Sequence, residues 1–247
     1  MATTHVYICH SHFPDMFSNL YTGQVLQRYP STWIADAPEN REILDEFIHA
    51  LSVAFEMPSE FDEAQFKKFP VALITDYIRK THRHYLFRKL PEMEQSIQLL
   101  LQDYSDDHPL LHILQAFYSD YKTELSLHIC EEENHLLPYV DYLLHAENEG
   151  CDLREFFRQT KRYCMNDFEQ DHHDDHEKEL LEIKRTIQLH RPPPTNGTPY
   201  RILVQQLDNF HRDLVVHGLI EDRVLLPKMK EMESRLTAAF NTVARLN

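Results

Sequence analysis

Four long stretches of this sequence carry apolar residues at spacings of three and four, the repeat of an α-helix that buries one face. With only 4 glycines and little strand-like alternation, the chain is predicted to be all-α. Four antiparallel helices joined by polar or proline-rich connections predict a four-helix bundle with up-down-up-down topology. The stretches cover about 70–102, 109–145, 152–190 and 198–231, and a terminal helix follows the last one.

Prolines and one cap residue mark the expected ends and interruptions of these helices. Pro91 predicts a kink or break in the first stretch, and Pro138 predicts a disturbance in the second. Asp107 is a candidate N-cap for the second stretch. The run Arg-Pro-Pro-Pro at 191–194 cannot continue a helix, so it predicts the last loop between helices.

The first 66 residues differ from the rest of the chain. They hold one clear helix candidate, over 39–57, between loops that contain prolines. We therefore predict two parts, a small helical N-terminal module over 1–66 and the bundle over 67–247.

Charge and composition exclude several classes of function. The formal net charge of −15 argues against binding to nucleic acid or anionic lipid, since both need clustered lysine and arginine. No stretch approaches the roughly 20 apolar residues that a membrane span needs, and the first residues lack the features of a secretory signal. The 4 cysteines form no CxxC pair and no disulfide framework, so we expect a protein of the reducing cytoplasm.

Two segments repeat one pattern. HICEEENHLLP begins at His128 and HGLIEDRVLLP begins at His217, and each places a glutamate four residues after the histidine. Both His–Glu pairs fall on the apolar stripe of their stretch, so both are predicted to point into the bundle. A further pair of this spacing, His145 and Glu149, lies at a helix end and is expected to face solvent.

The buried glutamates indicate a metal site. Burying a carboxylate costs several kcal/mol unless something compensates it, and neither stripe supplies a lysine or arginine at that level. A metal ion would compensate the charge. Two His–Glu turns that face each other supply two imidazoles and the carboxylates of Glu132 and Glu221, which can bridge two metals. The alternative is two hydrogen-bonded core histidines whose glutamates reach the surface.

The other two stretches carry candidates for two more histidine ligands. On the first stretch the apolar stripe passes through His82, whereas His84 falls off it, so His82 is preferred. On the third stretch the stripe leads back to His176 and then to His173 or His172, and the spacing does not rank these three.

This order of motifs resembles the hemerythrin-like domain of the iron–sulfur cluster repair di-iron (RIC) family. The resemblance covers about 70–230 and is most specific in ELSLHICEEENHLLPYV and YRILVQQLDNFHRDLVVHGLIEDRVLLPKM. It implies a hemerythrin-like bundle that holds two non-heme iron ions joined by oxo or carboxylate bridges. The ligands that it implies are His82, His128, Glu132, His173, His217 and Glu221.

The resemblance leaves the ligand of the third helix open. The family has a histidine that is followed by aspartate and lies seven residues before a leucine, and His173 fits this pattern with Asp174 and Leu180. Hemerythrin itself uses two histidines at HxxxH spacing, which His172 and His176 would match. The first choice gives a site with four histidines, and the second gives one with five.

The sequence also departs from the family. Arg83 separates His82 from His84 where the family has a tight His-His or Tyr-His segment, so His84 stays an alternative. The Cys-Cys pair that many members carry near the N-terminus is absent. Glu124, one turn before His128, matches a glutamate of the relatives and is expected behind the ligands or along an access path.

Three functions follow from this resemblance. The leading one is repair of iron–sulfur centres under nitrosative or oxidative stress, through iron donation to damaged proteins or reduction of nitric oxide. It needs a ferrous pair with an open position, which histidine-rich ligation with two carboxylates leaves. The second is reversible binding or sensing of dioxygen, and the third is a bundle whose metal site has decayed. Whether the protein is an enzyme stays open.

Overall fold

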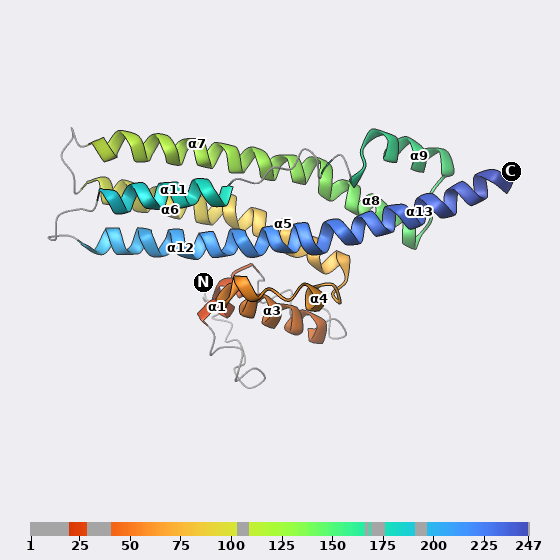
Figure 1. Cartoon of the computed structure of the whole chain (residues 1–247), viewed down its shortest axis with the longest axis horizontal. Coiled ribbons are helices and arrows are strands. Elements are labelled where there is room, and N and C mark those ends of the chain that lie inside the picture. Colours follow the sequence, from red (N-terminus) through yellow and green to blue (C-terminus); the bar gives the residue numbers. More distant parts are fainter. Residues whose placement is uncertain are drawn as a thin grey trace, which may run out of the picture.

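The computed structural model describes residues 20–28, 41–102, 109–165, 168, 176–190 and 197–246. None of these described residues lies in a β-strand, and four helical rods lie side by side along the long axis of the molecule (Figure 1). Consecutive rods run in opposite directions. The predicted all-α four-helix bundle is confirmed. No helix in the described ranges combines the length and the apolar character that crossing a membrane requires.

Each rod is one helix or several helical segments in direct succession. The first rod consists of α5 (Val71–His84), the π-helical segment η4 (Tyr85–Lys89) and α6 (Leu90–Leu101). The second consists of α7 (Pro109–Glu131), the π-helical η5 (Glu132–Leu136) and α8 (Leu137–Asn148). The third is α11 (His176–Leu189), and the fourth consists of α12 (Gly197–Ile220), the π-helical η7 (Glu221–Leu225) and α13 (Leu226–Leu246).

The four rods close around one apolar core at one end of the bundle. There α11 packs against α7 and α12, and α6 packs against α7 and α12. The side chains that fill the space between them are buried leucines, isoleucines and aromatic residues from all four rods, among them Leu100, Leu125, Ile183, Leu207 and Phe210. Burial of this apolar area is the main force that holds the rods together.

Proline does not break these rods. A proline inside an α-helix has no N–H to donate, and its ring collides with the carbonyl four residues earlier. At Pro91, Pro138 and Pro227 a five-residue π-helical segment lies just before the Leu-Pro pair and widens the turn. The break expected near Pro91 is therefore absent, and the disturbance expected near Pro138 takes the form of this local widening.

The three π-helical segments have the same register. In each, the N–H of the leucine before the proline donates to the carbonyl oxygen five residues earlier. Those carbonyls belong to Tyr85, Glu132 and Glu221, which begin the three segments. The repeated Leu-Leu-Pro thus places its π-turn directly at the glutamate, and π-turns of this kind are frequent at functional sites.

The predictions for the last two stretches need correction. A continuous third helix over 152–190 is wrong, because α9 (Leu153–Arg162) ends where Tyr163 takes extended backbone angles, φ −153° and ψ 134°. The following chain binds to the far end of the fourth rod instead, where Met165 N–H donates to the Glu233 carboxylate at 3.3 Å.

A separate terminal helix after the fourth stretch is also wrong. The fourth rod is helical without interruption from Gly197 to Leu246. Its sequence beyond the proline, KMKEMESRL, consists mostly of good helix formers, so nothing stops the helix there. The Asp107 cap lies outside the described residues.

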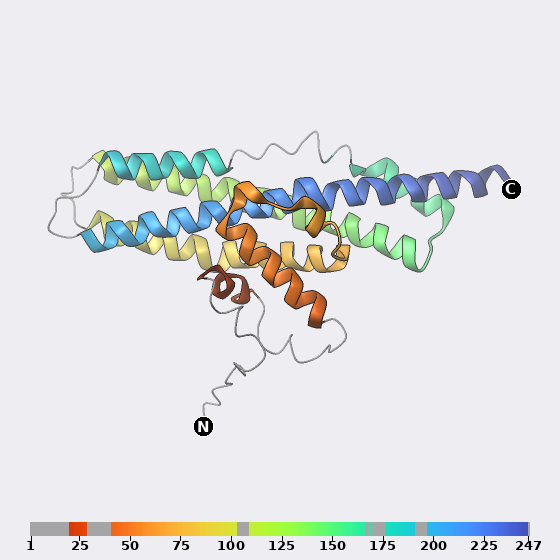
Figure 2. The same cartoon turned by 60° about the horizontal axis from the view of Figure 1, so that its bottom comes forward.

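The helices before residue 67 lie against one side of the bundle (Figures 1 and 2). They are α1 (Leu20–Leu26), α3 (Arg41–Glu56), the short 3₁₀-helix η3 (Pro58–Glu60) and α4 (Glu63–Phe66). The helix expected over 39–57 corresponds to α3. Buried residues of α3 share one hydrophobic core with buried residues of α12, η7 and α8. The boundary at residue 66 stays a prediction.

Candidate metal centre

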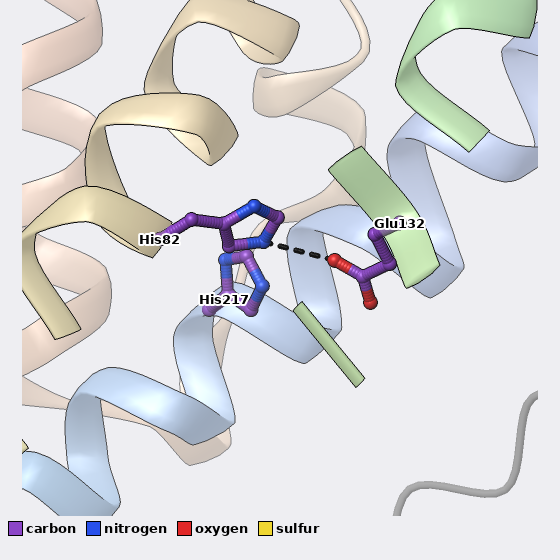
Figure 3. Close-up of side chains that lie close together, drawn as sticks. All are labelled: His82, Glu132 and His217. Carbon is purple, nitrogen blue, oxygen red and sulfur yellow. Dashed lines mark ion pairs between the residues drawn. The ribbon is translucent and has the colours of Figure 1, made fainter. Parts of the chain in front are cut away.

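Three buried side chains from three rods meet in the middle of the bundle. His82 comes from α5, Glu132 begins η5 and His217 lies near the end of α12 (Figure 3). One nitrogen or oxygen atom of each lies within 4.8 Å of the corresponding atoms of the other two, and all three side chains are buried. Imidazole and carboxylate donors at this separation suit a first-row transition metal.

The atoms that face one another here are close enough for ion pairs, but their geometry is not that of ordinary hydrogen bonds. His82 Nε2 lies 2.9 Å from Glu132 Oε2, and His128 Nε2 lies 2.7 Å from Glu132 Oε1. Within the described part of the chain, His82 Nε2 and both Glu132 oxygens nevertheless make no hydrogen bond of normal geometry. Buried polar atoms are almost always hydrogen-bonded. Donor atoms that converge without such bonds fit a site for a cation.

Glu132 connects this group to a second pair of histidines. Its other oxygen faces His128, whose ring lies 5.0 Å from the ring of His176, measured between centroids, at an angle of 66°. His176 belongs to α11, so the third rod also contributes a side chain. The Glu132 carboxylate therefore lies between two groups of imidazoles.

The second glutamate of the repeated pattern is also inside the bundle. Glu221 is buried, and its Oε2 lies 3.7 Å from His217 Nε2 on the preceding turn. The rings of His217 and His82 lie 5.2 Å apart. The structure thus brings together six side chains from the four rods, namely His82, His128, Glu132, His176, His217 and Glu221.

A carboxylate behind His82 sets the orientation of its ring. His82 Nδ1 lies 2.8 Å from Glu133 Oε1, the residue next to Glu132. A carboxylate bonded to one ring nitrogen keeps the proton there and leaves the other nitrogen as a ligand. Glu133 was not among the residues predicted from the sequence.

The charges of the group follow from its burial and its neighbours. Burial opposes ionisation of Glu132, but His128 and His82 hold its pKa well below the usual value. Burial and the adjacent His82 together lower the pKa of His217 to about 3. At His82 itself, burial is outweighed by Glu132 and Glu133, which raise the pKa of its imidazole. A charged carboxylate and a neutral imidazole at neutral pH are the forms that bind a metal ion.

Other candidates from the sequence lie elsewhere. His84 is buried, and burial together with the nearby cation of Arg28 lowers its pKa to about 3. The pair His145 and Glu149 is exposed, with its charged atoms 3.5 Å apart. His172 and His173 lie outside the described residues.

An acidic cavity lies beside the second pair of histidines. It opens between α7 and α11, and the pKa of Glu179 in its wall is raised by burial and by the neighbouring Glu124. Glu179 Oε2 lies 3.4 Å from His176 Nδ1. The residues that line the cavity are Phe117, Asp120, Tyr121, Glu124, Glu179, Glu182 and Ile183.

A buried ion pair near the centre was also not predicted. Arg28, just after α1, pairs with Asp213 on α12, one turn before His217. Asp213 lies on the inward face of its helix between apolar residues. A charged residue at such a position in the sequence indicates a buried partner. The sequence around Arg28 gives no such indication, because its partner is 185 residues away.

Curated proteins named iron-sulfur cluster repair protein YtfE are similar to this chain. Those from Escherichia coli and from Shigella boydii are 26% identical to it over 197 residues, which is 79% of this chain and 81% of theirs. The resemblance to the iron–sulfur cluster repair family is confirmed. No protein-family model matches the chain.

Proposed function

We propose that this chain is a non-heme di-iron protein that takes part in repair of iron–sulfur centres under nitrosative or oxidative stress. The observation that carries the proposal is the position of Glu132, a buried carboxylate with His82 at one oxygen and His128 at the other. The similarity of the chain to curated iron–sulfur cluster repair proteins supports the repair role.

The donor set suits two ions. His82 and His217 would hold one iron, and His128 and His176 would hold the other, with Glu132 and Glu221 shared between them. His173, the residue that the family resemblance implies, lies outside the described residues and remains a further candidate. A bound ferrous pair supplies electrons and an exchangeable coordination position for a diatomic ligand. Glutamates 132 and 221 would serve as carboxylate bridges.

The protein itself would orient the ligands and limit the access of water. Glu133 keeps Nε2 of His82 directed at Glu132. Buried Tyr121 lies against His176 with ring centroids 6.2 Å apart, and buried Phe210 packs against Tyr85 with ring centroids 4.9 Å apart. Apolar surroundings strengthen the attraction between a cation and its carboxylate ligands.

The acidic cavity favours iron donation. It adjoins His176 and carries the carboxylates of Asp120, Glu124, Glu179 and Glu182. A cleft lined by one sign of charge concentrates ions of the opposite sign and speeds their passage. We therefore propose that ferrous iron leaves and enters on this side, and that damaged iron–sulfur proteins receive it.

The proposal includes small-molecule ligands and a compartment. Nitric oxide or dioxygen would be the diatomic ligand, and reduction of nitric oxide would be the second route by which the centre protects iron–sulfur proteins. Cys130 and Cys151 are present as thiols, which fits work in a reducing cytoplasm.

Metal analysis tests the proposal directly. Protein purified without oxygen should contain about two irons per chain, and exposure to air should produce the absorption of an oxo-bridged ferric pair. Iron from the ferrous protein should then transfer to an iron-depleted iron–sulfur protein. Absence of iron after anaerobic reconstitution would contradict the proposal. Return of the ferrous spectrum on removal of oxygen, without iron transfer, would support dioxygen binding instead.

A further inference from the structure

The ion pair between Arg28 and Asp213 connects the N-terminal helices to the helix that carries His217. Both side chains are fully buried. The guanidinium of Arg28 also lies over two aromatic rings, 5.3 Å from the centre of Phe55 and 5.6 Å from that of Tyr77. Replacing a buried ion pair by well-packed apolar side chains is often neutral or stabilising, so docking alone does not call for one. The charge therefore indicates a role beyond anchoring.

Asp213 also binds Tyr85. One Asp213 oxygen pairs with Arg28, and the other accepts a hydrogen bond from the Tyr85 hydroxyl at 2.8 Å. Tyr85 begins η4, six residues before Pro91, as Glu132 and Glu221 begin their own π-helical segments. In the first rod, a tyrosine thus occupies the register that carries a carboxylate in the second and fourth.

Tyr85 in turn contacts a candidate ligand. Its ring lies 5.8 Å from the ring of His217, at an angle of 71°. His217 follows Asp213 by one turn of α12, so the two side chains share a face of the helix. Arg28, Asp213, Tyr85 and His217 form a continuous chain of contacts from the N-terminal helices to the site.

We propose that Arg28 is a positioning residue for the metal centre, which makes the N-terminal helices part of that centre. This inference rests on the proposed metal-binding function. Arg28 holds Asp213, and Asp213 holds Tyr85 edge-on against His217. Because both Asp213 oxygens are occupied, this carboxylate is also kept from acting as a third carboxylate ligand one turn from His217. Without Arg28, Asp213 would be a buried charge that could turn toward the metal.

Cobalt substitution of the full chain tests this role. The visible spectrum of bound Co²⁺ reports its coordination, and a titration gives its affinity. Arg28→Met and Tyr85→Phe should both alter the spectrum and weaken Co²⁺ binding about 10–100-fold, the usual effect of losing a group behind a ligand. Arg28→Lys should restore part of the affinity. Arg28→Met combined with Asp213→Asn should return the spectrum toward wild type.

Arg235→Met is the matched control. It removes an arginine whose partners, Glu147 and Glu231, lie on the exposed side of α8 and α13. Its Co²⁺ affinity and spectrum should equal those of the wild type.

Two results would overturn the inference. One is an Arg28→Met protein in which proteolysis of residues 20–66 is faster while Co²⁺ affinity and spectrum stay unchanged, because Arg28 would then only anchor the helices. If that variant does not fold, an unchanged spectrum in Tyr85→Phe has the same consequence. A wild-type chain that binds neither Co²⁺ nor Fe²⁺ would instead contradict the proposed metal function itself.

Discussion

The two halves of the candidate centre offer similar ligands in different surroundings. The side chains of His82 and His217 are 1% and 7% exposed, whereas those of His128 and His176 are 18% and 10% exposed. The first half is the more enclosed and contacts Glu133 and Tyr85, whereas the second half adjoins the acidic cavity through His176. This difference suggests one firmly held ion and one that exchanges.

The surroundings of the four histidines explain the difference. His82 and His217 lie well inside long rods and are backed by the packing of neighbouring segments. The side chain of His176 is 10% exposed and lies next to Glu179 in the wall of the acidic cavity, so it is closer to solvent. Parts of a protein with fewer buried contacts open more readily than enclosed ones. We therefore expect exchange of iron to begin on the side of His176.

The largest expected effect comes from the carboxylate between the halves. Glu132→Ala removes the group that contacts both His82 and His128, so both halves should lose iron and metal content should fall close to zero. Metal analysis of anaerobically purified protein measures this. Glu149→Ala, which alters the exposed pair with His145, is the control and should keep wild-type iron. Equal iron in the two variants would refute the bridging role.

Substitution of the candidate ligand His82 should lower the iron content more than substitution of the nearby buried His84. His82→Ala should lower iron content by about half or more, because Glu132 and His217 lose their partner. His84→Ala should lower the melting temperature through a cavity but leave the iron in place. The same two measurements, metal content and thermal unfolding, apply to both variants. The reverse order of iron loss would move the ligand by two residues.

The fold and the residues that face the inside of the bundle could be predicted from the apolar periodicity of the sequence. His128, Glu132, His217 and Glu221 could be placed inside the bundle because a buried helix face repeats every three to four residues. The same reasoning preferred His82 to His84, and the structure puts His82 beside Glu132. The ligand role of each of these residues stays a prediction.

What could not be predicted depends on contacts that periodicity does not encode. Pro91 was expected to kink or break the first rod and Pro138 to disturb the second, but the π-turns at Tyr85 and Glu132 accommodate them, since a wider turn removes the clash with the carbonyl. The long third helix failed because Tyr163 leaves the helical conformation. Arg28 pairs with Asp213 from a distant part of the chain, and no local sequence pattern predicts such a pair.

A ligand on the open side should affect the rate of iron release more than total binding. His176→Ala should speed the transfer of Fe²⁺ to a coloured chelator by about 10-fold or more, with about one iron released in the fast phase. His217→Ala, on the enclosed side, should instead lower the iron content of the purified protein. Release kinetics under anaerobic conditions separate the two. Identical kinetics in both variants would mean that the halves do not differ.

The smallest expected effect concerns the wall of the acidic cavity. Glu124→Gln removes one charge from the cavity without touching the side chains at Glu132. It should slow the uptake of Fe²⁺ by roughly 2-fold at low ionic strength, because one of several carboxylates that attract the ion is lost. Added salt should shrink this difference, since it screens charges that lie near solvent.

Glu149→Gln supplies the matched control for Glu124, because it removes the same charge from an exposed helix end. Stopped-flow uptake into metal-free protein, at low and high salt, should then separate local attraction from net charge. A slower rate in both variants would assign the effect to the overall negative charge of the chain. A slower rate in Glu124→Gln alone, lost at high salt, would identify the cavity as the entrance for iron. Exchange of iron at His128 and His176 would then depend on the carboxylates of α7 and α11, and not only on the exposure of His128.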